Sequence, residues 1–175
     1  MFYTSTRNKN IKVTASQAIA QGISEEGGLF VPCELPQFSL DKIASMVDMP
    51  YTERAKTVLK DFLTDFSEEE LDYCVNGAYA AEKFSSSKIA PTVNVAGNKN
   101  ILELWHGPTC AFKDMALQLL PYLMTVSAKK TADGKTIVIL VATSGDTGKA
   151  ALEGFKDVDN TGILVFYPVD GVSPM

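Results

Sequence analysis

The stretch TIVILVATSGDTGKA at residues 136–150 decides the fold. Its first half is almost wholly apolar, as expected of a strand that is covered on both faces. Gly145 and Gly148 then open a helix that continues through Phe155, and the apolar run GILVFY at residues 162–167 follows. This order of strand, glycine turn, helix and strand predicts a βαβ unit, and therefore a parallel sheet with a right-handed crossover.

The turn between this strand and its helix, residues 142–148, has the residue types of an anion site. Its backbone N–H groups and hydroxyls are able to surround a carboxylate or a phosphate, and its glycines let the backbone come close. The P-loop pattern would need a glycine in place of Thr143 and a serine or threonine in place of Ala150, and the dinucleotide fingerprint does not match either. From these residues alone, an anion site and a tight structural turn are equally well supported.

A second group of candidate residues lies in WHGPTCAFKD at residues 105–114. Lys113 stands there at the expected start of a helix, between Phe112 and Asp114. The positive end of a helix dipole and an apolar neighbour both disfavour the charged form of a lysine, and a neutral amine is the form that attacks an aldehyde. Asp114 has the opposite effect if it approaches the amine. On spacing alone, a solvated surface lysine is the commoner outcome.

The segments that flank this motif predict a hairpin and a broken helix. Residues 92–95 and 101–105 are short β-type runs separated by GNKN, which is consistent with a hairpin. Residues 112–130 have a helical pattern, and Pro121 should kink or split that helix.

The first part of the chain, residues 1–85, is expected to be mainly helical. Helices are predicted from capping residues and from apolar stripes at three-and-four spacing. They are a short helix from a capping box of Thr14 and Gln17 through Ile19, a helix capped by Ser39 that stops before Pro50, an amphipathic helix over residues 51–66, and a helix from a capping box of Ser67 and Glu70 to Tyr79. The run LFV at residues 29–31 predicts a brief extended segment. Such a helical preface is usually a packing or oligomer-forming element.

Composition places the chain among folded globular proteins. The 175 residues are 46% hydrophobic and 21% charged, which is ordinary for one core with a small appended domain. The net charge of -5 leaves phosphate-backbone binding without its usual electrostatic drive, so we expect no nucleic-acid partner. No apolar run approaches the roughly 20 residues that span a bilayer. Because a signal-peptide pattern is also missing at the start, we expect a cytoplasmic protein without a membrane partner.

The cysteines and the single histidine do not form a disulfide or metal pattern. Cys33, Cys74 and Cys110 are odd in number and far apart, and His106 alone gives no ligand spacing for structural zinc. We therefore expect three reduced thiols and no metal. Because a Gly-Pro turn separates His106 from Cys110, a turn histidine and a buried thiol are a better interpretation than a nucleophile pair.

Together the motifs resemble the threonine synthase family, which belongs to the fold-type II pyridoxal-phosphate enzymes. The segments HGPTCAFKDMA at residues 106–116 and ATSGDTG at residues 142–148 carry the resemblance. The opening of the chain is similar to the amino-terminal domain of that family, through YTSTR at residues 3–7, QGI at 21–23 and GGLFVP at 27–32. The lysine motif is highly specific, whereas the SGDTG loop has relatives across several fold-type II enzymes.

The resemblance implies an α/β fold with two domains. A small, mostly helical amino-terminal domain at residues 1–90 precedes the start of a doubly wound parallel-sheet domain at residues 91–175. The polar run at residues 85–87 and Pro91 mark the boundary. Because the chain ends a few residues after a strand and the predicted sheet is thin, we expect the second domain to be incomplete and the chain to be a fragment. A monomer or a homodimer is expected.

The resemblance also implies a cofactor, a substrate and a reaction. Lys113 matches the lysine that binds pyridoxal 5'-phosphate as a Schiff base and also shuttles protons. The loop that receives the substrate carboxylate in relatives is matched by Thr143, Ser144, Gly145, Thr147 and Gly148. Asp146 stands where relatives often have an asparagine that reaches the ring hydroxyl of the cofactor. The implied reaction converts O-phospho-L-homoserine and water to L-threonine and phosphate.

Several alternatives stay open. The family places its main cofactor-phosphate loop beyond residue 175, so we expect this polypeptide alone to bind the cofactor weakly and to turn over little. Another fold-type II lyase or sulfhydrylase is disfavoured by the helical domain and by the HGPT lead-in to the lysine. A catalytically silent threonine-synthase-like protein that binds phosphorylated metabolites through residues 142–148 is an alternative of another class, and a plain scaffold is the remaining one.

Overall fold

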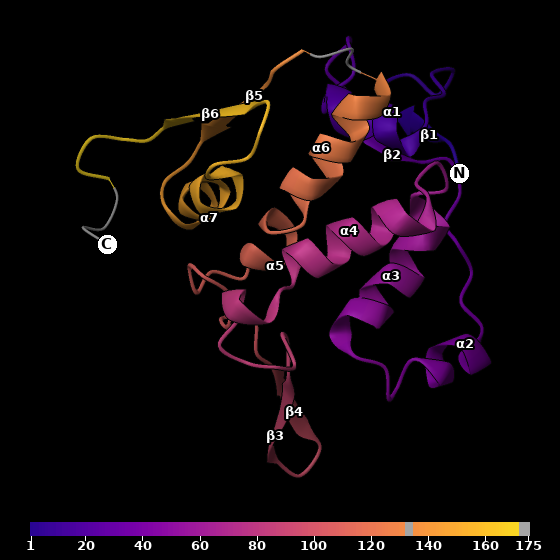
Figure 1. Cartoon of the computed structure of the whole chain (residues 1–175), viewed down its shortest axis with the longest axis vertical. Helices are drawn as coiled ribbons and strands as arrows, with labels where there is room; N and C mark the ends of the chain where they lie inside the picture. The colour runs from indigo at the N-terminus through magenta and orange to yellow at the C-terminus, as the bar shows by residue number, and fades with distance from the viewer. Residues whose placement is uncertain (132–134, 172–175) are drawn as a thin grey trace. The chain divides into compact units, whose positions relative to one another are not determined.

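The computed structural model describes residues 1–131 and 135–171. They form two compact units, whose helices and strands are labelled in Figure 1. The first unit consists of Met1–Val75 and Leu123–Lys135, and the second of Asn76–Tyr122 and Thr136–Met175. The division into domains at residue 90 stays a prediction.

A small antiparallel sheet and the helix α1 begin the first unit. β1 (Tyr3–Ser5) pairs with β2 (Phe30–Pro32), and α1 spans Ala15–Gln21. The predicted capping box is confirmed, because the hydroxyl of Thr14 accepts from the N–H of Gln17 (3.3 Å) and the N–H of Thr14 donates to the side chain of Gln17 (2.9 Å). The extended segment expected before Pro32 is β2, whereas nothing in the sequence pattern predicts β1.

Two further helices of the amino-terminal part start at the predicted caps. α2 (Leu40–Ser45) follows Ser39, whose hydroxyl accepts from the N–H of Lys42 (3.1 Å). It ends a turn sooner than its apolar pattern predicts. α4 (Glu68–Ala78) follows the second capping box, in which the N–H of Ser67 donates to Glu70 (2.7 Å) and the N–H of Glu70 donates to Ser67 (3.2 Å).

The helix between them, α3, explains how the first unit is packed. α3 (Tyr51–Phe62) is shorter than the predicted helix over residues 51–66. Leu63 and Phe66 follow the end of the helix and are buried in the core. Because both are apolar, they extend the apolar pattern of α3 in the sequence beyond the end of the helix. The core of this unit also contains Ala15, Leu71, Cys74, Val75, Leu123, Met124 and Val126. Burial raises the pKa of the Cys74 thiol to about 12, so this thiol is unreactive at neutral pH.

The second unit begins with a short 3-10 helix, η1 (Ala81–Lys83), and an exposed hairpin. β3 (Thr92–Ala96) pairs antiparallel with β4 (Lys99–Leu102), so the predicted hairpin is present. The second strand starts earlier than the predicted residues 101–105, because the chain reverses at Gly97, which has a φ of 52°, and the register shifts between Asn94 and Ala96.

The predicted helix over residues 112–130 is split in two, as Pro121 suggests. α5 (Asp114–Leu117) is a single turn, and α6 (Leu120–Thr131) follows it. Pro121 stands in the first turn of α6, where its missing N–H removes no helical hydrogen bond. Lys113 therefore precedes a helix of only 4 residues rather than a long one.

The βαβ unit predicted from the sequence is confirmed. β5 (Ile137–Ala142), α7 (Asp146–Phe155) and β6 (Thr161–Phe166) follow in order, and the two strands pair in parallel from Ile137 opposite Thr161 to Ala142 opposite Phe166. The fold is therefore a mixed α/β fold that contains a two-stranded parallel sheet among its described residues.

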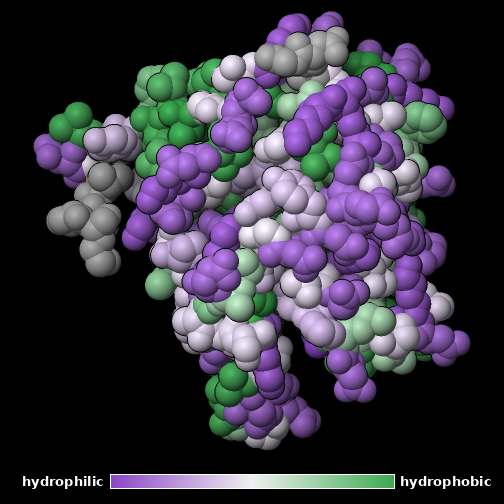
Figure 2. All heavy atoms as spheres, viewed as in Figure 1, coloured by the Kyte–Doolittle hydropathy of each residue, from purple (hydrophilic) through white to green (hydrophobic). Residues whose placement is uncertain are grey.

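The prediction that this strand is covered on both faces is wrong for the described residues. Val138 and Leu140 are 55% and 68% exposed, and Leu164 and Phe166 on β6 are 55% and 64% exposed. Burial alternates along β5 because α7 packs against one face of the two-stranded sheet only. Figure 2 shows hydrophobic side chains gathered over these two strands. None of the described helices has both the length and the apolar character needed to cross a bilayer.

Candidate functional site

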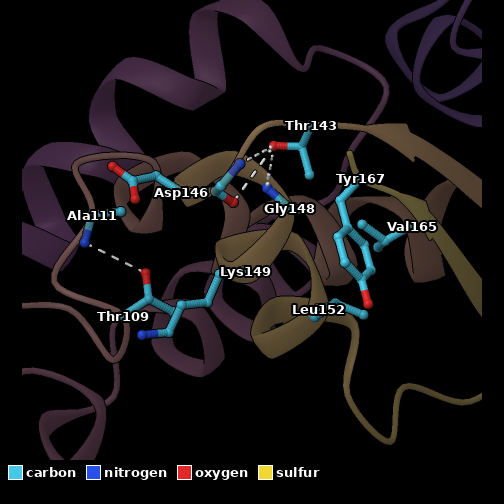
Figure 3. A pocket seen from close by; sticks show the side chains of 10 residues that line it. Thr109, Ala111, Thr143, Asp146, Gly148, Lys149, Leu152, Val165 and Tyr167 are labelled. Atoms are coloured by element: carbon cyan, nitrogen blue, oxygen red, sulfur yellow. Dashed lines mark hydrogen bonds between the residues drawn. The ribbon is translucent and has the colours of Figure 1, made fainter. Parts of the chain in front are cut away.

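A pocket of about 310 Å³ opens in the second unit, where β5 and β6 end. Parallel α/β sheets bind their ligands at this end of the strands. The lining residues are Thr109, Ala111, Thr143, Gly145, Asp146, Gly148, Lys149, Leu152, Val165 and Tyr167. In Figure 3, Leu152, Val165 and Tyr167 lie together on one side, while Thr109, Asp146 and Lys149 lie on the other. The pocket thus has an apolar side and a polar side.

The turn between β5 and α7 is held by the hydroxyl of Thr143. Its oxygen accepts from the N–H of Gly145 (3.2 Å) and from the N–H of Gly148 (3.1 Å). A Cβ on Gly148 would lie 2.1 Å from Cγ2 of Thr143. A glycine is therefore needed at residue 148, because it lets the first turn of α7 close onto Thr143.

Gly145 has a different role in the same turn. Its φ of 156° and ψ of -106° belong to a region that residues with a side chain rarely adopt. Space is not the constraint, since a Cβ there would meet nothing within 4 Å. The N–H groups of Asp146 and Thr147 come next, and they have no acceptor in the part of the chain that the structure describes. Such free donors at the start of a helix suit an anion.

The opposite wall, the loop at residues 107–111, is held by a buried carboxylate. Asp114 is 0% exposed, and its two oxygens accept from the N–H of Thr109 (2.8 Å) and from the hydroxyl of Thr109 (2.7 Å). A Cβ on Gly107 would lie 2.5 Å from the side chain of Asp114. The loop therefore wraps closely around this carboxylate, and Thr109 becomes part of the pocket wall.

Lys113 lies directly before α5 and is half-buried. Its ammonium lies 4.4 Å from the centre of the Phe112 ring, a cation–π contact. Asp114 does not approach the amine, since its oxygens bind Thr109, and no ion pair of Lys113 is present among the described residues. Lys113 is not one of the residues that line the pocket.

The structure brings part of the predicted site together. Thr143, Gly145, Asp146 and Gly148 line the pocket, whereas Ser144 and Thr147 are exposed and do not line it. The roles assigned to these residues and to Lys113 stay predictions.

Six of the pocket residues are not candidates from the sequence, and three of these six, Thr109, Lys149 and Tyr167, have polar side chains. Thr109 lies within the quoted lysine motif, and Lys149 follows the quoted glycine turn, but neither has a pattern that assigns it a role. Tyr167 comes directly after β6, so the rule that ligands bind beyond the carboxyl ends of strands was the signal that could have found it.

The expected burial of Cys110 is wrong. Cys110 is exposed. It lies in a tight turn, in which its own N–H donates to the carbonyl of Gly107 (3.1 Å) and its φ is 60°. His106 is bound instead between Ser85 (2.9 Å to Nδ1) and Glu103 (2.7 Å to Nε2). Within residues 1–131 and 135–171, no cluster of His, Cys, Asp and Glu side chains could hold a metal ion.

Comparison with known proteins gives a consistent picture. Residues 2–79 match the family described as "Threonine synthase N terminus". The chain is 41% identical to a threonine synthase of Pseudomonas aeruginosa, over 99% of this chain and 36% of that protein. It is 40% identical to human "Threonine synthase-like 1", over 90% of this chain and 22% of that protein. The crystal structure of PLP-bound threonine synthase from Brucella melitensis matches with a TM-score of 0.90 and 38% identity, over 99% of this chain and 37% of that chain.

Proposed function

Because the chain belongs to the threonine synthase family and matches its amino-terminal portion, we propose that it carries the lysine-bearing part of a pyridoxal-phosphate active site. The reaction is the conversion of O-phospho-L-homoserine and water to L-threonine and phosphate. The chain spans 36% of the Pseudomonas relative, so activity, substrate and cofactor are assigned to the protein that contains this sequence.

The observation that carries this proposal is the construction of the segment before Lys113. Asp114 accepts two hydrogen bonds from Thr109 (2.7 and 2.8 Å), and no ion pair of Lys113 with Asp114 or another carboxylate is present among the described residues. The same contacts connect the lysine motif to the wall of a pocket whose other wall offers unpaired N–H groups. An amine and an anion cradle on neighbouring segments are what an aldehyde cofactor and an anionic substrate require.

Lys113 and the turn at residues 143–148 would have separate roles in this reaction. When bound, pyridoxal phosphate supplies an electron sink for the substrate carbons. The amine of Lys113 would hold the aldehyde group of the cofactor and, once the substrate has released it, would accept a proton from Cα and a proton from Cβ of the substrate. Phosphate would leave from Cγ, the protons taken from Cα and Cβ would be returned to Cα and Cγ, and the hydroxyl group of a water molecule would add at Cβ while its remaining proton goes to the phosphate. The turn at residues 143–148 would hold the substrate carboxylate, and Asp146 would interact with the ring hydroxyl of the cofactor.

A second candidate function follows from a specific finding. The human relative that is 40% identical over 90% of this chain has the name "Threonine synthase-like 1", and such a name does not require the synthase reaction. A silent protein that binds phosphorylated metabolites through residues 142–148 would keep the anion cradle, and the amine of Lys113 would have no role in it. The two functions therefore differ in what Lys113 does.

Borohydride reduction in the presence of pyridoxal phosphate, followed by peptide mapping, tests the proposal. We expect a label on Lys113 and none in Lys113→Ala. Lys149→Ala is the matched control, because Lys149 is the lysine that lines the pocket. This variant should keep the label on Lys113. A label that persists in Lys113→Ala, or that lies on Lys149, would contradict the proposal. Phosphohomoserine turnover without dependence on Lys113 would contradict it as well.

A further inference from the structure

We propose that Asp114 is a positioning residue that makes the hydroxyl of Thr109 a hydrogen-bond acceptor at the pocket wall, so that this wall recognises the α-ammonium group of the substrate. The inference rests on the proposed function for the identity of the ligand, an α-amino acid. The contacts that support it belong to this chain alone.

The hydroxyl of Thr109 has a single proton, and Asp114 determines where that proton points. A carboxylate is only an acceptor, and a threonine hydroxyl has one proton to donate. The carboxylate of Asp114 takes that proton at 2.7 Å, and its other oxygen takes the N–H of Thr109 at 2.8 Å. Thr109 therefore has no proton left for a ligand. Its oxygen can only accept.

The lone pairs of this oxygen are largely available to the pocket. Among the described residues the donor that approaches it is the N–H of Ala111, at the long distance of 3.4 Å. The N–H of Cys110 is bound to the carbonyl of Gly107 instead (3.1 Å). A donor from a ligand would complete the hydrogen bonding of Thr109, and an anion would be repelled by the same lone pairs.

The facing wall has the opposite character. The unpaired N–H groups of Asp146 and Thr147 and the ammonium of Lys149 are donors. Figure 3 shows the side chains of Asp146 and Lys149 extending toward the loop that carries Thr109. A zwitterion fits this polarity, with its carboxylate at the start of α7 and its ammonium at Thr109, near the carboxylate of Asp146. An incoming substrate would be oriented in this way before its amine reacts.

Two probes separate this recognition from general anion binding. O-phospho-L-homoserine and its analogue without the amino group, 4-(phosphonooxy)butanoate, are titrated into the chain without cofactor, and binding is followed by amide chemical shifts. Hydrogen bonds that involve a charged group contribute about 1.5 kcal/mol or more, which corresponds to roughly tenfold in affinity. We therefore expect the wild type to prefer the amino compound about tenfold, Thr109→Ser to keep this preference, and Thr109→Val to lose it.

Asp114→Asn tests the inference more directly than the variants of Thr109, because it should reverse the direction in which the hydroxyl of Thr109 donates its proton. The amide oxygen has to accept the N–H of Thr109, so the amide NH2 faces the hydroxyl and donates to it. The hydroxyl then points its own proton into the pocket, and the preference for the amino compound should fall by about tenfold or reverse. A purely structural role of Asp114 would weaken both probes equally. Lys149→Gln is the control for the competing ammonium, and it should not reduce the preference.

The inference is overturned if wild type and Thr109→Val show the same preference, or if the wild-type chain binds neither probe. These outcomes are separate from the labelling of Lys113, which needs cofactor and no substrate. Failure of the label with a retained preference would remove the proposed function and leave the recognition at Thr109. A label with no preference would do the reverse.

Discussion

The two walls of the pocket are built by opposite means. The turn at residues 143–148 is shaped by glycines and by one hydroxyl, with Thr143 bound to the N–H groups of Gly145 and Gly148. The loop at residues 107–111 is shaped by a buried carboxylate that lies outside it in the sequence. The first wall depends on the absence of side chains, and the second depends on the presence of a charge.

This difference determines how each wall should fail. In the glycine turn, a new methyl group either collides with a neighbour or strains the backbone, and both effects are local. In the carboxylate loop, loss of Asp114 leaves the N–H and the hydroxyl of Thr109 without the buried acceptor that they share. Removal of one partner of a buried hydrogen bond costs more than replacement of both partners by apolar groups, because the remaining polar group stays buried without an acceptor or donor.

The largest expected effect is therefore that of Asp114→Ala. Two hydrogen bonds to a carboxylate with 0% exposure are lost, and we expect the free energy of unfolding to fall by about 3 kcal/mol. Urea denaturation followed by near-UV circular dichroism measures this change. Asp159→Ala, at an exposed position, is the control and should change stability by less than about 0.5 kcal/mol. Equal effects of the two variants would show that the carboxylate does not hold the loop.

The next effect in size is that of Gly148→Ala, for which we expect a loss of about 2 kcal/mol. Its Cβ would lie 2.1 Å from Cγ2 of Thr143, and overpacking of this kind costs about 1 to 3 kcal/mol. Thr143→Ser removes that methyl group and keeps the hydroxyl, so Gly148→Ala should cost less than half as much in that background. Gly145→Ala is the matched control, because its cost arises from a φ of 156° and should be unchanged by Thr143→Ser. A double-mutant cycle from thermal unfolding checks both statements, and rescue of Gly145→Ala would argue against them.

The smallest effect is that of Asp65→Asn in the first unit, where a half-exposed carboxylate makes contacts of the same type. Asp65 accepts from the N–H of Ser16 (3.0 Å) and from its hydroxyl (2.5 Å). Burial raises its pKa, but the hydrogen bonds from Ser16 outweigh burial, and the net pKa is lowered. The folded pKa thus lies below the unfolded value of about 3.9, so its stabilisation is present above that value and is lost as the pH falls through the folded pKa.

We expect Asp65→Asn to cost about 1 kcal/mol at pH 7. The difference from the wild type should shrink as the pH falls below about 4. Urea unfolding at pH 7, 5 and 3 measures it. A difference in unfolding free energy that stays constant over this range would mean that the charge of Asp65 does not stabilise the fold. A carboxylate would then need a fully buried position, like that of Asp114, to stabilise the loop that it binds.

Local signals predict much of the fold. Both capping boxes, at Thr14 and Ser67, are confirmed. They could be predicted because each involves two residues that are only three positions apart in the sequence. The βαβ unit follows from one apolar run and two glycines. Pro121 correctly indicates that the helix before it breaks, because a proline excludes an ordinary helix interior.

Nonlocal contacts are what the sequence pattern does not show. β1 is three residues long and exists because β2 pairs with it. Asp114 points toward Thr109 because it binds the N–H and the hydroxyl of that residue. Its position next to Lys113 in the sequence does not predict this direction. The exposed face of β5 could not be predicted from hydrophobic periodicity either. An apolar run predicts that a strand tends to be buried, but it does not identify which segment buries it.

That open face has a practical consequence for anyone who prepares this polypeptide. Among the described residues, β5 and β6 pair only with each other, so each has an outer edge whose peptide groups can recruit another strand. Alternate apolar side chains next to those edges favour such recruitment, and a net charge of -5 opposes it only while salt is low. Concentrated, saline stocks should therefore precipitate first, and dilute, low-salt buffers should keep the material in solution.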